Sequence, residues 1–473
     1  MKYFLSLHIL LLLILNVSAQ NSYPTGMDFD DEQYATVLKK AKLTRSLDIL
    51  PPAASVKQYA PIPASQGNNG TCVAWASAYC GKTIVEAIKN GWTDKQLITK
   101  NAYSPAFLFR MIKPNDNNCV GGSVLAEALA TLKTKGVVPF ANIPQTCIPA
   151  VNDQQLQQAS SYKIKDYMKL FDLDAAAETK IRTVKKSLAE KKPVVFGMIC
   201  PPSFQQAAGV WQSVGPPLST QGGHAMCVVG YDDTKYGGAF EIQNSWGNHW
   251  ANEGYIWIKY NDFAAFTRYA FEFVDLPAPK PQVPDLAGEL KFVLSSGETI
   301  PATLFQSTRG LKVVTAKTAP GPLTLYKATN AYTSGTRFRI YISNNQPAYV
   351  YALSTDLSNE ITKIFPYAEG ISAALTDKKN DVAIPDEDHH IEFDDKPGRD
   401  LLCVLYSRNE LDITDIIKQV AAQEGTFSEK IFKVLGNEMV EPGNITFSTD
   451  KVSFEGYSKG KSVVAMMMEL EHK

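Results

Sequence analysis

Four side chains of this sequence have the types and the chain order needed for covalent attack on a carbonyl carbon. They are Gln66, Cys72, His224 and Asn244. A thiol can act as nucleophile, an imidazole as its base, and an amide as the group that orients the imidazole, while a second amide donates to the oxyanion. Each residue alone is weak evidence, because buried cysteines and histidines commonly belong to a core. The four together, in order and in fitting local contexts, indicate acyl transfer through a thiolate.

The residues that follow Cys72 predict a helix with the thiol in its first turn. From Cys72 to Lys89 the chain contains no proline, and apolar residues recur every three to four positions. The pair Asn90-Gly91 is typical of a helix end. A helix N-terminus and a neighbouring imidazolium both stabilise a thiolate. We therefore expect the pKa of Cys72 to lie below its ordinary value of about 8.5.

His224 and Asn244 stand at the ends of two predicted strands. His224 follows two glycines and opens an apolar run, whereas Asn244 closes a short apolar stretch. Two strand ends can bring the amide onto the imidazole, and Trp246 can then cover that hydrogen bond and exclude water. Gln66 precedes Cys72 by six positions, where its amide and the Cys72 backbone N–H can converge on one oxyanion.

These segments resemble the papain-like cysteine peptidases, the C1 family. The likeness is closest in Asn244-Ser245-Trp246-Gly247 and the following 252–256, Asn-Glu-Gly-Tyr-Ile, and it covers about residues 50 to 275. It implies an α+β fold, in which a helical left lobe carries Cys72 and a β-barrel-like right lobe carries His224 and Asn244. The substrate would lie in the cleft between the two lobes.

The resemblance also covers Gly121 and Gly122, which by analogy line the substrate groove. The alternative is that the two glycines only mark a tight turn before a predicted helix at residues 123–135. The family usually has a cysteine where this chain has Asn69, so Cys119 lacks its usual partner. Cys119 and Cys147 are a plausible disulfide pair.

The first 49 residues predict export and only a short segment before the catalytic region. Residues 1–19 have a basic start, an apolar run and small residues before Ala19, which is typical of a signal peptide. The mature chain would then be extracytoplasmic, either secreted or periplasmic, with no membrane span. Residues 20–49 have room for one helix, near Glu32–Arg45. Latency would have to come from this segment, from the C-terminal region or from a partner.

Composition narrows the classes of partner. The chain has 473 residues and a formal net charge of −1, which argues against nucleic acid or an anionic membrane as the main ligand. Six histidines and seven cysteines do not cluster at metal-ligand spacing. We expect no metal and no other cofactor, and protein or peptide substrates.

A second domain is predicted after a proline-rich connector. The connector spans residues 276–284, and residues 285–473 contain short β-rich runs and one helix at 412–424, which favours a mainly β sandwich-like domain. This region resembles, more weakly, an uncharacterised β domain attached to bacterial proteases and kinases. It has no catalytic constellation, and the prolines predict few contacts across the connector.

The interpretation that follows is a secreted, bacterial-type cysteine endopeptidase whose catalytic domain spans residues 50–275. An exopeptidase would need an element that blocks one end of the cleft. The other alternative is a non-catalytic module that binds peptides or proteins on a papain-like fold. The complete set of Gln66, Cys72, His224 and Asn244 favours the enzyme.

Overall fold

The computed structural model describes residues 23–44, 49–276, 282–305, 323–356 and 360–473. The predicted signal peptide and the middle of the proline-rich connector lie outside these residues. In the part that is described, no helix is long and apolar enough to cross a membrane.

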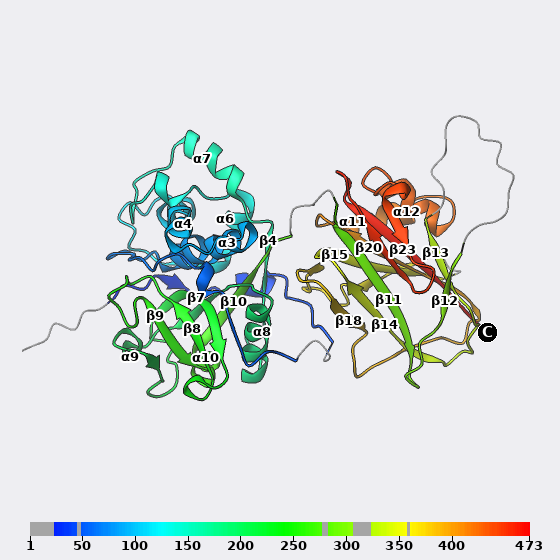
Figure 1. Ribbon diagram of the computed structural model, residues 1–473, viewed down its shortest axis with the longest axis horizontal. Coiled ribbons are helices and arrows are strands. Elements are labelled where there is room, and N and C mark those ends of the chain that lie inside the picture. Colours follow the sequence, from blue (N-terminus) through cyan, green and yellow to red (C-terminus); the bar gives the residue numbers. More distant parts are fainter. Residues whose placement is uncertain (1–22, 45–48, 277–281, 306–322, 357–359) are drawn as a thin grey trace, which may run out of the picture.

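One lobe of the N-terminal half is helical (Figure 1). Its central rod begins at Cys72 and runs through α2 (Cys72–Ala74), a π-helical stretch η3 (Trp75–Lys82) and α3 (Thr83–Asn90). Gly91 ends the rod in the left-handed conformation, at φ 67° and ψ 26°, as the sequence predicts. The other helices of this lobe are α4 (Lys95–Lys100), α5 (Pro105–Ile112), α6 (Leu125–Thr134) and α7 (Asp153–Ala159), with the short turns η4 (Phe140–Asn142) and η5 (Ser160–Tyr162).

The other lobe is built on one sheet with the strand order β4-β10-β5-β7-β8-β9-β6. The strands are β4 (Asp166–Lys169), β5 (Val194–Ile199), β6 (Val210–Trp211), β7 (Gly223–Asp232), β8 (Ala239–Gln243), β9 (Tyr255–Lys259) and β10 (Thr267–Val274). Its helical segments are η2 (Lys57–Tyr59), α8 (Ala177–Ala189), α9 (Pro202–Gln205), η6 (Lys235–Gly237) and α10 (Tyr260–Phe266), and β2 (Ala53–Ser55) pairs with β7. Strand β7 is buried along nearly its whole length, which explains its continuous apolar sequence.

The central rod packs closely on this sheet at Gly81. A side chain at Gly81 would begin 2.6 Å from Val195 Cγ2 and 2.7 Å from Phe273 Cε2. The absence of a Cβ therefore lets the rod approach β5 and β10, and this approach helps to position Cys72 at its start.

The C-terminal half is a sandwich of two sheets, as predicted, with orders β18-β14-β11-β22-β21 and β12-β13-β23-β20-β15-β16. Its elements are β11 (Leu286–Leu294), β12 (Ala302–Phe305), β13 (Leu325–Ala328), β14 (Arg337–Asn344), β15 (Ala348–Thr355), β16 (Ile361–Phe365), β17 (Ala374–Leu375), β18 (Asn380–Ile384), β19 (Ile391–Glu392), β20 (Gly398–Ser407), α11 (Ile413–Ala421), α12 (Phe427–Leu435), η7 (Pro442–Asn444), β21 (Ile445–Phe447), β22 (Ser453–Gly456) and β23 (Val463–His472). One apolar core fills the space between the sheets. Helices α11 and α12 contribute to a second apolar cluster with β15, β20 and β23.

Contacts between the two halves are extensive, so the expectation of few contacts across the connector is wrong. Met168 and Val274 of the N-terminal half share an apolar cluster with Tyr349 and Tyr351 of the sandwich. The Lys133 ammonium group lies 2.8 Å from Asp166 and 3.1 Å from Glu410 of the sandwich. Apolar residues at the ends of β4 and β10 are buried by the second domain, which a proline-rich connector alone does not reveal.

The segment before the catalytic region is mostly extended. It forms β1 (Met27–Asp28) and a short helix α1 (Asp31–Thr36). The helix predicted for Glu32–Arg45 is therefore too long. After Thr36 the backbone is extended, because Lys39 bridges Lys169 on one side and Ile371 on the other. Tertiary hydrogen bonds have replaced helical ones there.

Replacing Gly81 with valine should destabilise the protein, because the new side chain would overlap β5 and β10. Overpacking of this kind costs about 1–3 kcal/mol in the free energy of unfolding. Denaturant unfolding of purified protein measures the change. Lys89→Val is the matched control, since Lys89 is exposed on the same rod, and it should stay within about 0.5 kcal/mol of the unmodified protein. Equal effects of the two substitutions would contradict the close packing at Gly81.

Candidate active site

Cys72 is the first residue of the central rod, and its side chain is fully buried. The backbone N–H groups of Ala225, Val73 and Cys72 act to lower the pKa of this thiol. Ala225 directly follows His224 in β7, so the thiol lies where the helical lobe meets the sheet. This position is set by the start of the helix on one side and by the start of a buried strand on the other.

His224 and Asn244 form the hydrogen bond that the sequence predicts. His224 Nε2 lies 2.8 Å from Asn244 Oδ1, and both side chains are buried. The same oxygen accepts a hydrogen bond from the Ser245 backbone N–H at 2.7 Å. Because Oδ1 only accepts, Nε2 carries the proton. Nδ1 makes no hydrogen bond within the described residues, so it is the ring nitrogen that remains able to take a proton.

Trp246 covers the imidazole. Its ring stacks on His224 with centroids 4.5 Å apart and an interplanar angle of 18°. Tyr23 stacks on the Trp246 ring, with centroids 5.0 Å apart. The Trp246 indole N–H donates to the Pro24 carbonyl at 2.8 Å. His224 is therefore shielded from water by Trp246, and Trp246 in turn by the N-terminal segment.

The Gln66 amide is oriented by a second side chain. Its Oε1 accepts a hydrogen bond from the Ser245 hydroxyl at 2.6 Å, which turns Nε2 to the other side. Nε2 donates to the Asn69 carbonyl at 2.7 Å and to the Thr25 carbonyl at 3.3 Å. A carbonyl of the N-terminal segment thus occupies the donor that the sequence assigns to an oxyanion.

Gly121 and Gly122 lie directly before β3 (Ser123–Val124), which pairs in parallel with β1. A side chain at Gly122 would begin 2.1 Å from the Asp28 carboxylate. The Gly121 N–H donates to Asp116 at 2.7 Å. The glycine pair therefore permits close approach of an extended chain, and the helix that follows begins at Leu125, later than the sequence predicts.

The N-terminal segment joins the two lobes across the site. Met27 pairs with Ser123 in the helical lobe and with Gly223, the residue before His224, in the sheet lobe. The Met27 side chain is 4% exposed and packs against Gly197, where an added Cβ would begin 2.2 Å from its methyl carbon. No sequence pattern predicted this strand. Gly26 was the available signal, because its φ of 133° and its contact with Gly70 tolerate no side chain.

Burial sets the protonation of the two central groups. It raises the pKa of the Cys72 thiol to about 12, and the nearby Asp28 carboxylate of β1 acts in the same direction. Burial lowers the pKa of His224 to about 4, although the hydrogen bond to Asn244 opposes this shift. The expected lowering of the Cys72 pKa is therefore wrong for this covered state. A charged pair needs water or dipoles around it, and the segment excludes water.

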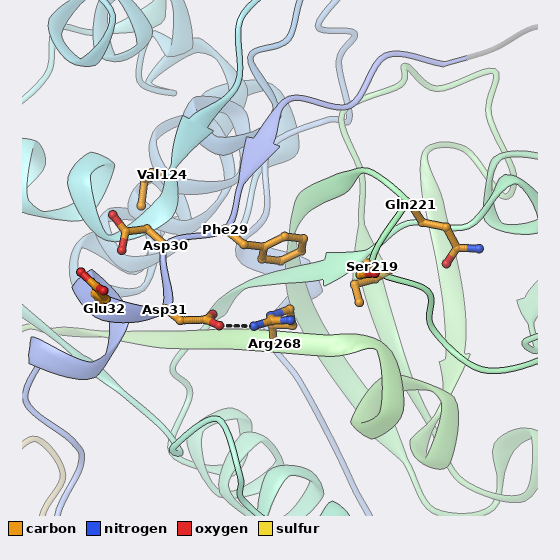
Figure 2. A pocket seen from close by; sticks show the side chains of 9 residues that line it. Phe29, Asp30, Asp31, Glu32, Val124, Ser219, Gln221 and Arg268 are labelled. Atoms are coloured by element: carbon orange, nitrogen blue, oxygen red, sulfur yellow. Dashed lines mark hydrogen bonds and ion pairs between the residues drawn. The ribbon is translucent and has the colours of Figure 1, made fainter.

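A cavity of about 500 Å³ lies beside the N-terminal segment (Figure 2). The segment lines it with residues 29–32, and Gln221 and Arg268 lie on the opposite side. Asp31 forms an ion pair with Arg268 and accepts a hydrogen bond from the Tyr269 hydroxyl at 2.6 Å. These contacts anchor the start of α1 on β10.

Cys119 and Cys147 form a disulfide, as predicted, with their Cα atoms 5.9 Å apart. The other cysteines, at positions 72, 80, 200, 227 and 403, are buried and unbridged. The bridge ties the loop before β3 to the chain after η4, and so stabilises the side of the cleft that β1 contacts.

Comparison with known proteins assigns this fold. Residues 58–269 match the family described as Papain family cysteine protease. The chain carries a papain-family domain. The predicted α+β architecture of a helical lobe and a sheet lobe is thereby confirmed. Residues 331–410 match a family described only as a domain of unknown function, DUF4384.

The relatives of the papain-family domain are distant. An uncharacterized peptidase C1-like protein of Acanthamoeba polyphaga mimivirus is 26% identical over 212 residues, which cover 41% of this chain and 63% of the viral protein. The cathepsin L-like proteinase of Fasciola hepatica is 24% identical over 198 residues, which cover 41% of this chain and 56% of that protein. This chain therefore spans about 56–63% of the length of these curated relatives.

Solved structures of cysteine proteases are similar to about half of the chain. Xylellain, a cysteine protease from Xylella fastidiosa, has a TM-score of 0.42 and 23% identity, over 53% of this chain and 95% of that protein. The bromelain protease from Ananas comosus has a TM-score of 0.38 and 17% identity, over 47% of this chain and 99% of that protein.

Replacing Met27 with aspartate should uncover Cys72, because a carboxylate without a partner is not stable in the apolar position against Gly197. We expect iodoacetamide to label Cys72 of this variant at least about ten times faster than Cys72 of the unmodified protein at neutral pH, because burial of an unpaired charge is among the changes with the largest energetic effects. Mass mapping of the alkylated cysteines over time measures the rate. Ala35→Asp adds the same group at an exposed position of α1 and should leave the rate unchanged. Slow labelling of both variants would show that the segment is not what shields the thiol.

Proposed function

We propose that this protein is a cysteine endopeptidase that hydrolyses proteins or peptides outside the cytoplasm. The proposal is supported most by the hydrogen bond between His224 Nε2 and Asn244 Oδ1, which Trp246 covers. His224 lies in β7, the strand that packs against the helix start at Cys72. The papain-family match supports the class of enzyme. The disulfide between Cys119 and Cys147 is consistent with an oxidising compartment, as is the apolar run at residues 4–15.

In this proposal the reaction begins when the N-terminal segment leaves the cleft and water can solvate charge. The Cys72 proton then moves to His224 Nδ1, and the thiolate attacks the substrate carbonyl carbon. The Cys72 backbone N–H and Gln66 Nε2 donate to the resulting oxyanion. His224 returns the proton to the leaving amine as the peptide C–N bond breaks, which leaves an acyl group on sulfur.

Deacylation uses the same groups in reverse. His224 takes a proton from water as the water oxygen attacks the thioester carbon, and Gln66 again donates to the oxyanion. The C–S bond breaks, and the carboxylic acid product leaves. Asn244 holds the imidazole at the angle that both steps need, and Trp246 keeps water from competing for the hydrogen bond between them.

The domain arrangement is also part of the proposal. Residues 20–49 form the short N-terminal segment, of which residues 23–28 cover the site. Residues 50–275 form the peptidase, residues 276–284 the connector and residues 285–473 the β domain. Gly121 and Gly122 would contact substrate where Gly122 now lies against Asp28 of β1.

Replacing Cys72 with alanine should abolish peptide hydrolysis, since no other group forms the acyl intermediate. The test uses the Met27→Asp background, so that the segment does not limit access, with fluorogenic peptides that have blocked and free termini. Cys80→Ala is the matched control, because that thiol is also buried on the central rod but faces Gln243. Turnover by the Cys72→Ala variant above the rate without protein would sink the assignment. Cleavage of blocked peptides separates an endopeptidase from an exopeptidase.

Replacing Gln66 with alanine should lower kcat by about a hundredfold, as the loss of one oxyanion donor does in other hydrolases. KM should change little, because the donor acts mainly in the transition state. Steady-state kinetics in the same Met27→Asp background separate the two constants. Asn69→Ala controls for the loop, since its side chain hydrogen-bonds to the Gln66 backbone carbonyl and not to the Gln66 amide in the part of the chain that the structure describes. An altered KM with unchanged kcat would make Gln66 a substrate-positioning residue.

A further inference from the structure

Residues 39–44 connect the segment in the cleft to the β domain, and their backbone is hydrogen-bonded to that domain at Lys39, Lys42 and Thr44. The Lys39 N–H donates to the Gly370 carbonyl at 2.6 Å, and the Ser372 N–H donates to the Lys39 carbonyl at 2.7 Å. Further along, the Thr44 N–H donates to the Asp381 carbonyl at 2.8 Å. An extended chain is therefore held by main-chain bonds, which is how proteins bind peptides at a strand edge.

Side chains of the same stretch enter the β domain. Ala41 is 5% exposed and belongs to the apolar core of the sandwich, against which Leu43 also packs. Between them, the Lys42 N–H donates to the Tyr367 hydroxyl at 3.2 Å. Alternate residues thus face the domain, as in a paired strand, and the buried position accepts a small apolar side chain.

The opposite edge of the stretch is bound to the peptidase domain. The Lys40 N–H donates to the Lys169 carbonyl and the Lys169 N–H donates to the Leu38 carbonyl, both at 2.9 Å. The Lys40 ammonium group lies 2.7 Å from Glu190 and 2.8 Å from Glu272. Thr376 of the β domain donates to Glu272 at 3.0 Å, so the buried cluster is completed from the second domain.

We propose that the β domain contains a peptide-binding edge, formed by Tyr367, residues 370–372 and Asp381, whose ligand is the chain's own residues 39–44. Binding there helps to keep residues 23–28 in the cleft, so the domain of unknown function regulates access to Cys72. The regulatory role rests on the proposed function. The contact itself is tested by the accessibility of the Cys72 thiol, whether or not the protein hydrolyses peptides.

The coupling follows from chain geometry. Only residues 29–38 separate the part in the cleft from the part on the β domain, and α1 fills most of that length. Release of residues 39–44 from the β domain removes one attachment of this short connection. Two attachments to the peptidase domain stay: the pairing of Leu38 and Lys40 with Lys169, and α1, where Tyr34 stacks on Tyr269 with centroids 4.4 Å apart and donates to the Phe171 carbonyl at 2.6 Å. We therefore expect partial opening of the cleft rather than full release.

The test compares Ala41→Glu with Leu38→Glu in the full chain. Position 41 is buried in the β domain and position 38 is exposed, so the same carboxylate is disruptive only at the first. Hydrogen exchange reports on residues 23–28 and 39–44 separately, and the rate of Cys72 alkylation by iodoacetamide reports on the cleft. Ala41→Glu should speed exchange in both stretches and raise the alkylation rate at least about tenfold, while Leu38→Glu should change neither.

Tyr367→Phe is a second, milder variant, which removes only the hydroxyl that accepts from Lys42. It should raise the alkylation rate about two- to fivefold, in keeping with the loss of one hydrogen bond. If Ala41→Glu does not fold, the alkylation rate of Tyr367→Phe tests the proposed peptide-binding edge by itself. Unchanged alkylation with Tyr367→Phe would then overturn the proposal.

The outcomes separate the regulatory contact of the β domain from the proposed peptidase activity. Fast exchange at residues 39–44 with slow alkylation of Cys72 would overturn the coupling, and continued protection of residues 39–44 in Ala41→Glu would overturn the binding edge. Faster alkylation without any peptide hydrolysis would support the regulatory contact and contradict the proposed peptidase activity.

Discussion

The pairing of β1 with strands of both lobes is the interaction on which the state of this site depends. Met27 is paired with Ser123 on one side and with Gly223 on the other, so one short strand closes the space between helical lobe and sheet lobe. Three consequences follow from it. Cys72 and His224 lose water and stay neutral, Gln66 donates to the Thr25 carbonyl, and Trp246 is covered by Tyr23.

The side chains that we propose as catalytic already contact one another even though the site is covered. The His224–Asn244 bond, the stacking of Trp246 and the Ser245–Gln66 bond are all present beneath the N-terminal segment. Removal of β1 would thus require no new arrangement of these side chains, only the entry of water and substrate. The energetic barrier to activity lies in displacing the segment, because the apolar contact of Met27 and its main-chain bonds must be lost together.

The β domain also contacts the N-terminal segment. A proline-rich connector predicts two independent units, yet the domains share an apolar cluster and a buried group of charges. The segment between Leu38 and Thr44 lies in their interface and bonds to both. The position of the β domain and the occupancy of the cleft are therefore linked through one stretch of backbone.

The sequence alone determined the local chemistry. The helix that begins at Cys72 and ends at Gly91, the two strands that carry His224 and Asn244, and the β-rich C-terminal half follow from periodicity and turn residues, which act over a few positions. Tertiary structure alone decided the rest. β1 and the stretch 39–44 have no predictive local pattern, because their paired strands lie more than 90 residues away in β3, β7 and β4 and more than 300 away at Gly370. Pairing at that range, and the burial that inverts the expected pKa of Cys72, depends on the folded surroundings rather than on neighbouring residues.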